Sequence, residues 1–300
     1  MMPVWGIDLG GTKIEAVILE DRESMNVLRR MRLPTEADKG YLHILRQISK
    51  LIETMSAEAG FRPDRIGIAH PGTLDPDTQT LKNSNTVVMN GKPMKRDLEN
   101  FLGMRVNMAN DANCFAVAEA TAGAVPEHLE YAEVVFGVIL GTGVGGGIAV
   151  NGKILGGRHG IGGEWGHNFL DESGGPCYCG KSGCTERVIS GPALESYYTD
   201  LTGEAFNLSE IVKKHEAGDD SAATQTVRRL LTMFGKGIAS VINILDPDAV
   251  VIGGGVGNID LLYTEGVEEV KKHVFNNRLD TLFLKPALGD SAGVFGAALL

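Results

Sequence analysis

The first part of the chain alternates short apolar runs with glycine-rich turns. Residues 4–8 are apolar up to Asp8, and a second apolar run covers residues 14–19. Two such runs joined by a Gly-Gly turn are typical of a β-hairpin, so we predict two paired strands here and a third strand over residues 26–33.

Helical and strand patterns then alternate. Residues 41–60 carry apolar side chains three and four positions apart and end at a glycine, which predicts an amphipathic helix. We predict strands over residues 65–69 and 105–109, and the second of these leads into a helix over residues 112–123.

The second half of the chain begins with the same plan. An apolar strand over residues 132–140 runs into a glycine-rich stretch, 141–147, and a further strand follows over residues 148–150. Two halves that each open with a strand, a Gly-Thr turn and a strand indicate an internal duplication, and hence two related lobes that face each other across a cleft.

The rest of the chain is mostly helical by its spacing of apolar residues. Two short strands interrupt the helices, and the first of them leads into a glycine-rich turn. The predicted helices are 192–198, 208–216, 222–245, 262–275 and 293–300, and the predicted strands are 249–252 and 282–284.

Composition and charge narrow the class of protein. Hydrophobic residues make up 43% and charged residues 22% of the 300 positions, which is ordinary for a globular protein. The net charge of −10 disfavours a nucleic-acid-binding surface. No apolar stretch reaches the roughly 18 residues of a membrane span, and the N-terminus lacks the features of a signal peptide. We therefore expect a cytoplasmic protein that binds neither nucleic acid nor a membrane.

One histidine and three of the four cysteines lie close together in the sequence. His167, Cys177, Cys179 and Cys184 follow the spacing H-x9-C-x-C-x4-C. Four ligands of this kind close a tetrahedral shell with no vacant position, which is typical of structural zinc. A disulfide is disfavoured because Cys177 and Cys179 are poorly placed to bridge each other and no secretion signal is present. We predict a structural Zn²⁺ on these four residues.

Three glycine turns could lie against a nucleotide. The turn after Asp8 is not a Walker A loop, because its spacing differs and a strand follows, yet its N–H groups and hydroxyl suit phosphate oxygens. An ordinary hairpin turn is the alternative. Asp8 itself could orient a metal ion. The turn over residues 253–257 lacks the βαβ unit of a Rossmann site, so we favour a surface on which an adenosine could lie.

Other polar residues follow predicted strands, and local sequence leaves their roles open. Asp111 is either the N-cap of the helix that follows or a general base that points into a cleft. The amides of residues 83–86 and the turn over residues 70–73 could contact a ligand or simply reverse the chain.

Several motifs stand in one order along the chain. They are D-L-G-G-T-K at residues 8–13, N-D-A-N at 110–113, G-T-G-V-G-G-G at 141–147, G-E-W-G-H with C-Y-C-G-K-S-G-C-T-E inside 163–186, and D-P-D-A-V-V-I-G-G-G from residue 246. Together they resemble the ROK family of bacterial sugar kinases, from about residue 4 to the C-terminus. Such kinases share the α/β, actin-like (ribonuclease H-like) ATPase fold with two lobes around a central cleft.

The resemblance implies a fold and an activity. We expect a smaller lobe of residues 1–112 and 287–300, and a larger lobe of residues 113–286 that carries the zinc loop. With K-N-S-N-T and P-C-Y-C-G-K, the chain looks most like bacterial fructokinases of the fructokinase/mannokinase type. The expected reaction is in-line transfer of phosphate from ATP, with Mg²⁺, to D-fructose, with mannose as a second acceptor. We also expect a homodimer.

The resemblance also assigns roles to residues on the sugar side. Asp111 would be the general base that takes the proton of the attacking hydroxyl. His167 would hold zinc through one ring nitrogen and face the sugar with the other. The residues expected to bind the sugar are Asn85, Asn110, Glu164, His167 and Glu186, with the backbone at Gly72.

On the nucleotide side, the resemblance places Asp8 near Mg²⁺. It assigns the phosphates to the two Gly-Thr turns and the adenosine to the third glycine turn. The residues are Gly10, Gly11, Thr12, Lys13, Gly141, Thr142 and Gly143 for the phosphates, and Gly254 and Gly255 for the adenosine.

Alternative activities stay open. An N-acetylglucosamine kinase or a glucokinase of the same family would share these motifs, because only pocket size and a few contacts would differ. A sugar-responsive repressor is disfavoured by the acidic charge and by motifs that start at residue 8, and a sensor without activity by the intact Asp111. Two departures from relatives are Ser84, where glucokinase-like members have proline, and His70, for which a packed side chain is favoured over a specificity role.

Overall fold

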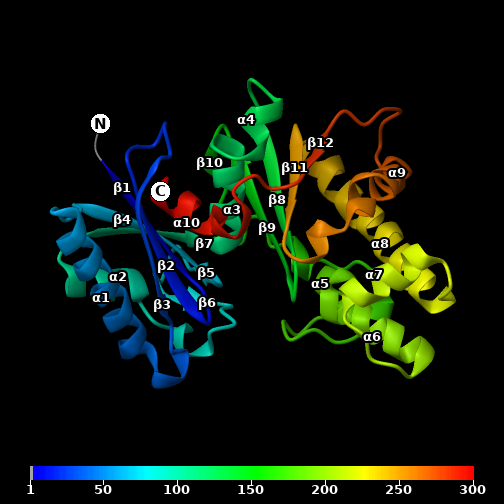
Figure 1. Cartoon of the computed structure of the whole chain (residues 1–300), viewed down its shortest axis with the longest axis horizontal. Helices are drawn as coiled ribbons and strands as arrows, with labels where there is room; N and C mark the ends of the chain where they lie inside the picture. Colours follow the sequence, from blue (N-terminus) through cyan, green and yellow to red (C-terminus); the bar gives the residue numbers. More distant parts are fainter. Residues whose placement is uncertain (1–2) are drawn as a thin grey trace. The chain divides into compact units, whose positions relative to one another are not determined.

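The structure is a computed structural model that describes residues 3–300, and its contacts divide the chain into two compact units (Figure 1). Unit 1 comprises the described residues up to His128, together with Gly147–Gly162 and Ala287–Leu300. Unit 2 comprises Leu129–Gly146 and Gly163–Pro286.

The sheet of unit 1 consists, in order across the sheet, of β3 (Val27–Pro34), β2 (Lys13–Leu19), β1 (Val4–Leu9), β4 (Arg65–His70) and β7 (Arg105–Asn110). The three strands β3, β2 and β1 are antiparallel neighbours, whereas β1, β4 and β7 run parallel. The predicted hairpin and the predicted later strands are confirmed. Because β1, β4 and β7 are parallel, their carboxyl ends lie at one edge of the sheet.

Helices cover both faces of this sheet (Figure 1). The amphipathic helix α1 (Tyr41–Ala59) packs on one face together with α2 (Met94–Leu102). The opposite face carries α10 (Ala292–Ala298), which packs against α3 (Asp111–Thr121). A short helix, α4 (Ala124–His128), follows α3.

Glycines let α10 approach the sheet closely. A Cβ atom at Gly67 would lie 1.7 Å from the carbonyl oxygen of Ala297, and one at Gly6 would lie 2.2 Å from that of Val294. In α10, a Cβ at Gly296 would lie 1.9 Å from the carbonyl oxygen of Cys114. Side chains at these positions would push α10 away from β1, β4 and α3, so the packing requires glycine.

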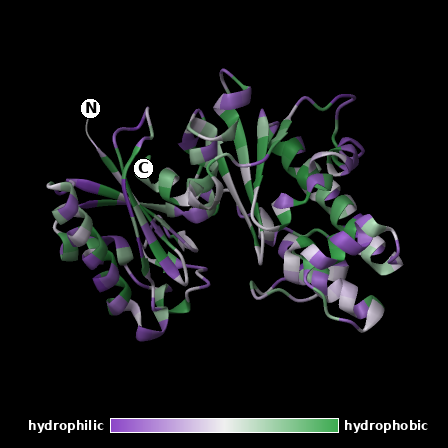
Figure 2. Ribbon diagram, viewed as in Figure 1, coloured by the Kyte–Doolittle hydropathy of each residue, from purple (hydrophilic) through white to green (hydrophobic). Residues whose placement is uncertain are grey.

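In unit 2, the parallel strands β8 (Val134–Leu140), β11 (Ala249–Gly253) and β12 (Leu282–Leu284) belong to a sheet of order β10-β9-β8-β11-β12. Strand β9 (Val144–Val150) begins in unit 2, and its residues from 147 onward group with unit 1, as does β10 (Lys153–Ile154). These strands are predominantly hydrophobic (Figure 2).

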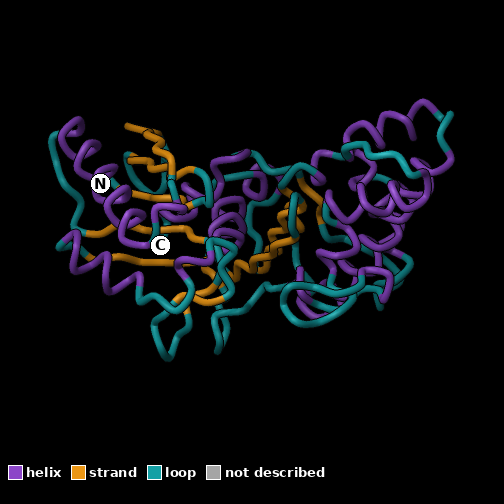
Figure 3. Tube along the Cα trace, turned by 90° about the horizontal axis from the view of Figure 1, so that it is seen from below, coloured by secondary structure: helices purple, strands orange, loops and turns teal. Residues whose placement is uncertain are grey.

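The helices of unit 2 form one group beside its strands (Figure 3). The longest of them, α8, packs against α6, α7 and α9 and buries an apolar stripe. The helices are α5 (Thr185–Ile189), α6 (Gly191–Thr202), α7 (Leu208–Ala217), α8 (Ser221–Leu245) and α9 (Glu265–Lys271).

Several local features differ from the predictions. The glycine stretch after residue 143 forms part of β9 instead of a turn, because a Cβ at Gly147 would lie 2.2 Å from the carbonyl oxygen of Ala112 and only glycine permits that approach. Helix α9 is shorter than expected because the backbone at Thr264 is not helical. Helix α2 was not predicted, and neither was the small hairpin of β5 (Thr73–Leu74) and β6 (Leu81–Lys82).

The division into units also differs from the expected lobe boundary at residue 112. Helices α3 and α4 and residues 147–162 group with unit 1, because α3 packs closely on α10. The lobe boundaries themselves stay a prediction. Among the residues that the structure describes, no helix is long and apolar enough to cross a membrane.

Candidate functional site

Polar side chains gather at the carboxyl ends of β1, β4 and β7 in unit 1. Asp8 lies near the end of β1, and Asn110 ends β7 directly before α3. The side-chain oxygen of Asn110 accepts a hydrogen bond from the backbone N–H of Ala112 (2.9 Å), and its amide nitrogen donates to the carbonyl oxygen of Gly72 (2.9 Å). Asn110 is therefore the N-cap of α3, which leaves Asp111 as the first residue of the helix.

Gly72 brings a second loop to the same place. Its φ of 79° lies in the left-handed region, and a Cβ there would lie 2.7 Å from the backbone nitrogen of Ser84. The Ser84 backbone is held in turn by the side-chain amide of Asn90, which accepts from its N–H (2.9 Å) and donates to its carbonyl oxygen (3.0 Å). Asn85 is thereby held beside the end of β4. Sequence reasoning missed Asn90, and the only signal for it was its position in a polar loop.

The predicted phosphate turn between β1 and β2 shares a cavity with Asn85. Thr35 closes the turn, because its hydroxyl donates to the carbonyl oxygen of Gly10 (2.7 Å) and its N–H donates to that of Thr12 (2.9 Å). Gly11 and Thr12 are left exposed and, together with Asn85, line a cavity of about 440 Å³ within unit 1.

The negative charge of Asp111 affects the ionisation of Asp8 in this cluster. The pKa of Asp8 is raised to about 7, mainly by burial and then by the negative charges of Asp111 and Glu15, while Lys13 opposes the shift. Helix α10 contributes Gly293 here, since a Cβ at that position would lie 3.1 Å from a carboxylate oxygen of Asp8. A buried carboxylate whose pKa is raised in part by a neighbouring carboxylate suits a hard divalent cation, which would favour its ionised form.

His70, next to this cluster, is fully buried. Burial lowers its pKa to about 4, although a contact of Nδ1 with the carbonyl oxygen of Pro71 (3.2 Å) acts in the opposite direction. His70 is therefore a neutral, packed side chain at physiological pH.

In unit 2, the turn between β8 and β9 is joined to α5 and to the start of α6. The carboxylate of Glu186 accepts a hydrogen bond from the backbone N–H of Val144 (3.1 Å). A Cβ at Gly143 would lie 2.5 Å from the same carboxylate oxygen, so glycine leaves the space that Glu186 occupies. Gly191 donates its N–H to the carbonyl oxygen of Gly141 (2.9 Å), which ties the turn to the start of α6.

The same turn opens into a cavity of about 700 Å³ that lies entirely within unit 2. Gly141, Thr142 and Gly255 line it, as expected for a nucleotide site. Gly254 does not line the cavity. It has a φ of 84°, and a Cβ atom there would lie 2.2 Å from the carbonyl oxygen of Leu140. The cavity is large enough for a nucleoside.

Helices α6 and α7 supply cavity residues that sequence reasoning missed. On α7 they are spaced three and four positions apart, which places them on one helix face. This periodicity could have identified them, although it is equally typical of an ordinary solvent-exposed face. The missed polar residues include Glu195, Asn207, Ser209, Lys213, Glu216 and Asp260.

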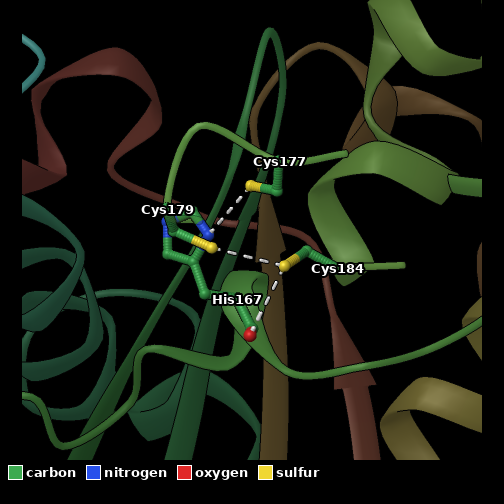
Figure 4. Close-up of side chains that lie close together, drawn as sticks. All are labelled: His167, Cys177, Cys179 and Cys184. Atoms are coloured by element: carbon green, nitrogen blue, oxygen red, sulfur yellow. Dashed lines mark hydrogen bonds between the residues drawn. The ribbon is translucent and has the colours of Figure 1, made fainter. Parts of the chain in front are cut away.

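The structure brings His167 and the three cysteines of the predicted zinc motif together (Figure 4). One ligand atom from each lies within 4.8 Å of all the others. The Sγ atoms of Cys179 and Cys184 are 3.5 Å apart, and Cys177 Sγ is 3.7 Å from His167 Nδ1. A tetrahedral zinc shell with Zn–S bonds of about 2.3 Å would separate its ligands by roughly 3.5–3.8 Å. The geometry therefore suits a metal of this kind.

The chemistry of the four ligands agrees with this geometry. Burial raises the pKa of Cys184 to about 12, and the neighbouring thiols add to the effect. The pKa of Cys179 is lowered, mainly by a backbone hydrogen bond from Lys181. A cation bound at the centre would stabilise all three thiolates. The fourth cysteine, Cys114, is fully buried in α3 and does not belong to this cluster.

Comparison with known proteins gives one consistent family. The model of the ROK family matches residues 4–300. An N-acetyl-D-glucosamine kinase of Vibrio vulnificus (strain YJ016) is 36% identical over 306 aligned positions, which cover 99% of this chain and 98% of that protein. The corresponding kinase of Pasteurella multocida (strain Pm70) is 35% identical with the same coverage.

Solved structures of ROK-family proteins are also similar to this chain. A ROK hexokinase from Thermus thermophilus superposes with a TM-score of 0.87 at 33% identity, covering 99% of this chain and 97% of the other. A ROK family glucokinase from Streptomyces griseus, in complex with glucose and AMPPNP, superposes with a TM-score of 0.77 at 27% identity, covering 99% and 98%.

The raised pKa of Asp8 predicts a pH-dependent loss of stability. Because the pKa is higher in the folded chain than the 3.8 of an ordinary aspartate, the folded state binds the extra proton between pH 4 and 7, and stability falls as pH rises through this range. Asp8→Asn removes this loss. We expect the variant to be more stable than the original chain by about 3–4 kcal/mol at pH 8, with little difference at pH 4.

Thermal midpoints at the two pH values measure this effect. They should be recorded without Mg²⁺ and without a chelator, so that the cysteine cluster is left undisturbed. The control is Asp200→Asn, at an exposed aspartate of α6. An increase in the thermal midpoint of Asp8→Asn that is equal at both pH values would contradict the raised pKa of Asp8.

Proposed function

The chain belongs to the ROK family and is an ATP-dependent sugar kinase, and we propose that its sugar substrate is N-acetyl-D-glucosamine. The resemblance and the actin-like (ribonuclease H-like) ATPase fold predicted from the sequence are confirmed. One observation carries the substrate proposal: kinases named for N-acetyl-D-glucosamine are 35–36% identical to this chain over nearly the whole length of both.

The relatives favour this sugar over the D-fructose that we expected from the sequence. That expectation relied on short motifs around Asn85 and in the cysteine loop, whereas the relatives match across the whole chain. D-fructose remains the second candidate, because K-N-S-N-T and P-C-Y-C-G-K are present as they stand in fructokinases.

In the proposed mechanism, Asp111 is the general base. It would accept the proton of the attacking sugar hydroxyl while the γ-phosphate is transferred in line. Charge in a loose phosphoryl transition state gathers on the phosphate oxygens, so the main task of Asp111 is to orient the hydroxyl. Asn110, as the N-cap of α3, fixes the backbone that carries Asp111.

The nucleotide would bind through the glycine turns. We propose that the exposed N–H groups and hydroxyl of the turn over Gly10, Gly11, Thr12 and Lys13 contact phosphates, with Gly141, Thr142 and Gly143 as the second phosphate turn. The 700 Å³ cavity that includes Gly255 would take the adenosine. Mg²⁺ held near Asp8 would neutralise phosphate charge.

We propose that polar side chains and one backbone segment bind the sugar hydroxyls. From unit 1 we propose Asn85 and Asn110, with the backbone at Gly72. From unit 2 we propose Glu164 and His167, in the loop that carries the cysteines, and Glu186, in α5 directly after it. Carboxylates accept strongly from hydroxyls, and a sugar that lacks one such hydroxyl leaves a charge unpaired, which is a basis for specificity.

We propose that the Cys₃His cluster binds Zn²⁺ and that its role is structural. Four protein ligands leave no position for a substrate atom, so the metal would hold the loop and take no part in phosphoryl transfer. The homodimer and the cytoplasmic location stay predictions.

A substrate panel tests the proposed function. Release of ADP would be measured with ATP, Mg²⁺ and each of N-acetylglucosamine, fructose, mannose, glucose and N-acetylmannosamine. We expect kcat/KM to be highest for N-acetylglucosamine, by at least about 10-fold, because an acetamido contact is worth a few kcal/mol. A preference for fructose would favour the second candidate, and no turnover with any sugar would contradict both.

Asp111→Asn tests the catalytic base. The amide keeps the size of the side chain but cannot accept a proton, so turnover should fall by about 10³-fold or more. Sugar affinity, measured by calorimetry, should stay within about threefold because the hydrogen-bonding groups elsewhere are intact. Asp200→Asn is the matched control. Near-normal turnover of Asp111→Asn would refute the base assignment.

A further inference from the structure

Unit 1 contains a second cavity, at the end of its sheet that lies away from Asp8 and Asn110. The cavity has a volume of about 620 Å³. It opens beside the first residues of the parallel strands, because Val4 begins β1, Arg65 begins β4 and Arg105 begins β7. The six residues of β4 span roughly 16 Å. The cavity is therefore separate from the strand ends that carry the candidate catalytic residues.

Four arginines line this cavity: Arg22, Arg62, Arg65 and Arg105. Arg65 and Arg105 are register partners in the parallel pair of β4 and β7, so their side chains leave neighbouring strands about 5 Å apart on the same face. Arg22 lies near Arg65, since burial and then the positive charge of Arg65 lower the pKa of Arg22. Like charges at such spacings repel each other and destabilise a sheet.

The acidic residues around the cavity do not neutralise these charges. Asp21 accepts hydrogen bonds from the backbone N–H groups of Glu23 (2.9 Å) and Ser24 (2.7 Å), so its carboxylate is used within its own turn. Glu23 and Asp64 also line the cavity and are exposed. Among the side chains that the structure describes, no carboxylate forms an ion pair with any of the four arginines.

Two of the arginines have main-chain partners instead. Arg22 donates to the main-chain oxygen of Leu300 (3.0 Å), and Arg62 donates to that of Leu102 (2.6 Å). The guanidinium groups of the other two arginines have no hydrogen-bond acceptor within the described part of the chain. Both are exposed and lie side by side, so an anion from solvent can reach them together.

We propose that Arg22, Arg65 and Arg105 bind the phosphate group of a small molecule. A guanidinium group donates paired hydrogen bonds to phosphate oxygens, and the negative charge of the phosphate would offset the repulsion among the three arginines. With a net charge of −10, the chain as a whole repels an extended polyanion such as nucleic acid, which favours a small ligand.

The rest of the cavity has room for an organic group attached to the phosphate. Small-molecule sites commonly measure about 300–1,000 Å³, and a phosphate ion alone needs far less. Phe61 and Pro63 supply apolar surface beside the arginines. A sugar phosphate combines a charged group with such a body. Binding here would not depend on the proposed sugar kinase activity, because no residue assigned to that activity lines the cavity.

Stability without a ligand separates this site from a structural arginine cluster. Arginines that stabilise a fold lower its stability when they are replaced, whereas arginines that repel each other raise it. In a phosphate-free buffer of low ionic strength, we expect Arg65→Gln and Arg105→Gln each to raise the thermal midpoint by about 1–3 °C. The matched control is Arg29→Gln, at an exposed arginine of β3 in the same unit, which should leave the midpoint unchanged.

The second measurement adds glucose 6-phosphate at about 10 mM, with inorganic phosphate and with NaCl of equal ionic strength as comparisons. We expect glucose 6-phosphate to raise the midpoint of the original chain and of Arg29→Gln by at least about 3 °C more than NaCl does. The shift should be less than half as large in Arg65→Gln and Arg105→Gln. Any part that survives in both variants would come from other phosphate sites, such as the glycine turns.

The comparisons also identify the source of the phosphate. A larger shift with glucose 6-phosphate would support a sugar phosphate as the ligand, and an equal shift with inorganic phosphate would support free phosphate at the same site. A lower midpoint of both arginine variants without ligand would overturn the repulsion. A shift that NaCl reproduces, or that both arginine variants retain in full, would overturn the phosphate site. None of these measurements involves turnover, so failure of the proposed function would leave their outcome unchanged.

Discussion

The convergence of His167, Cys177, Cys179 and Cys184 within 4.8 Å is the constraint on which the cysteine loop of unit 2 depends. Residues 163–184 contain single turns of 3₁₀ helix and isolated bridges, and short backbone hydrogen bonds, such as that from Gly183 N–H to the carbonyl oxygen of Gly175 (2.9 Å), hold the turns between them. Cys184 caps α5, whose second residue is Glu186. A metal bound at this point would therefore fix a carboxylate that also holds the turn between β8 and β9.

In unit 1, the ends of strands and helices position the polar residues. Parallel strands carry Asp8 and Asn110 to one edge of the sheet, and the side-chain amide of Asn110 joins the start of α3 to the turn at Gly72. Glycines then allow the backbone to pack where side chains would clash, as at Gly67 beneath α10. The functional groups therefore lie on rigid strand and helix ends, which suits a reaction that depends on positioning.

The sequence predicted the elements whose periodicity is strong, and its spacing of one histidine and three cysteines predicted the cluster that the structure brings together. It did not predict α2, because this short helix buries only Met94, Leu98 and Leu102 among mostly polar residues. Contacts between residues distant in the sequence could not be predicted either, such as the hydrogen bond from Asn110 to the carbonyl oxygen of Gly72. The sugar was the weakest inference, because kinases for different hexoses share the catalytic residues and differ only in pocket shape.

The central claim is that the metal cluster organises the sugar-binding residues of unit 2. The most direct measurement is the affinity of the sugar, by calorimetry, for zinc-loaded protein, for protein stripped of zinc, and for stripped protein to which zinc has been returned. The account predicts that stripping weakens sugar binding at least about 10-fold and that zinc restores it. Equal affinity in all three samples, with metal content verified, would contradict the account.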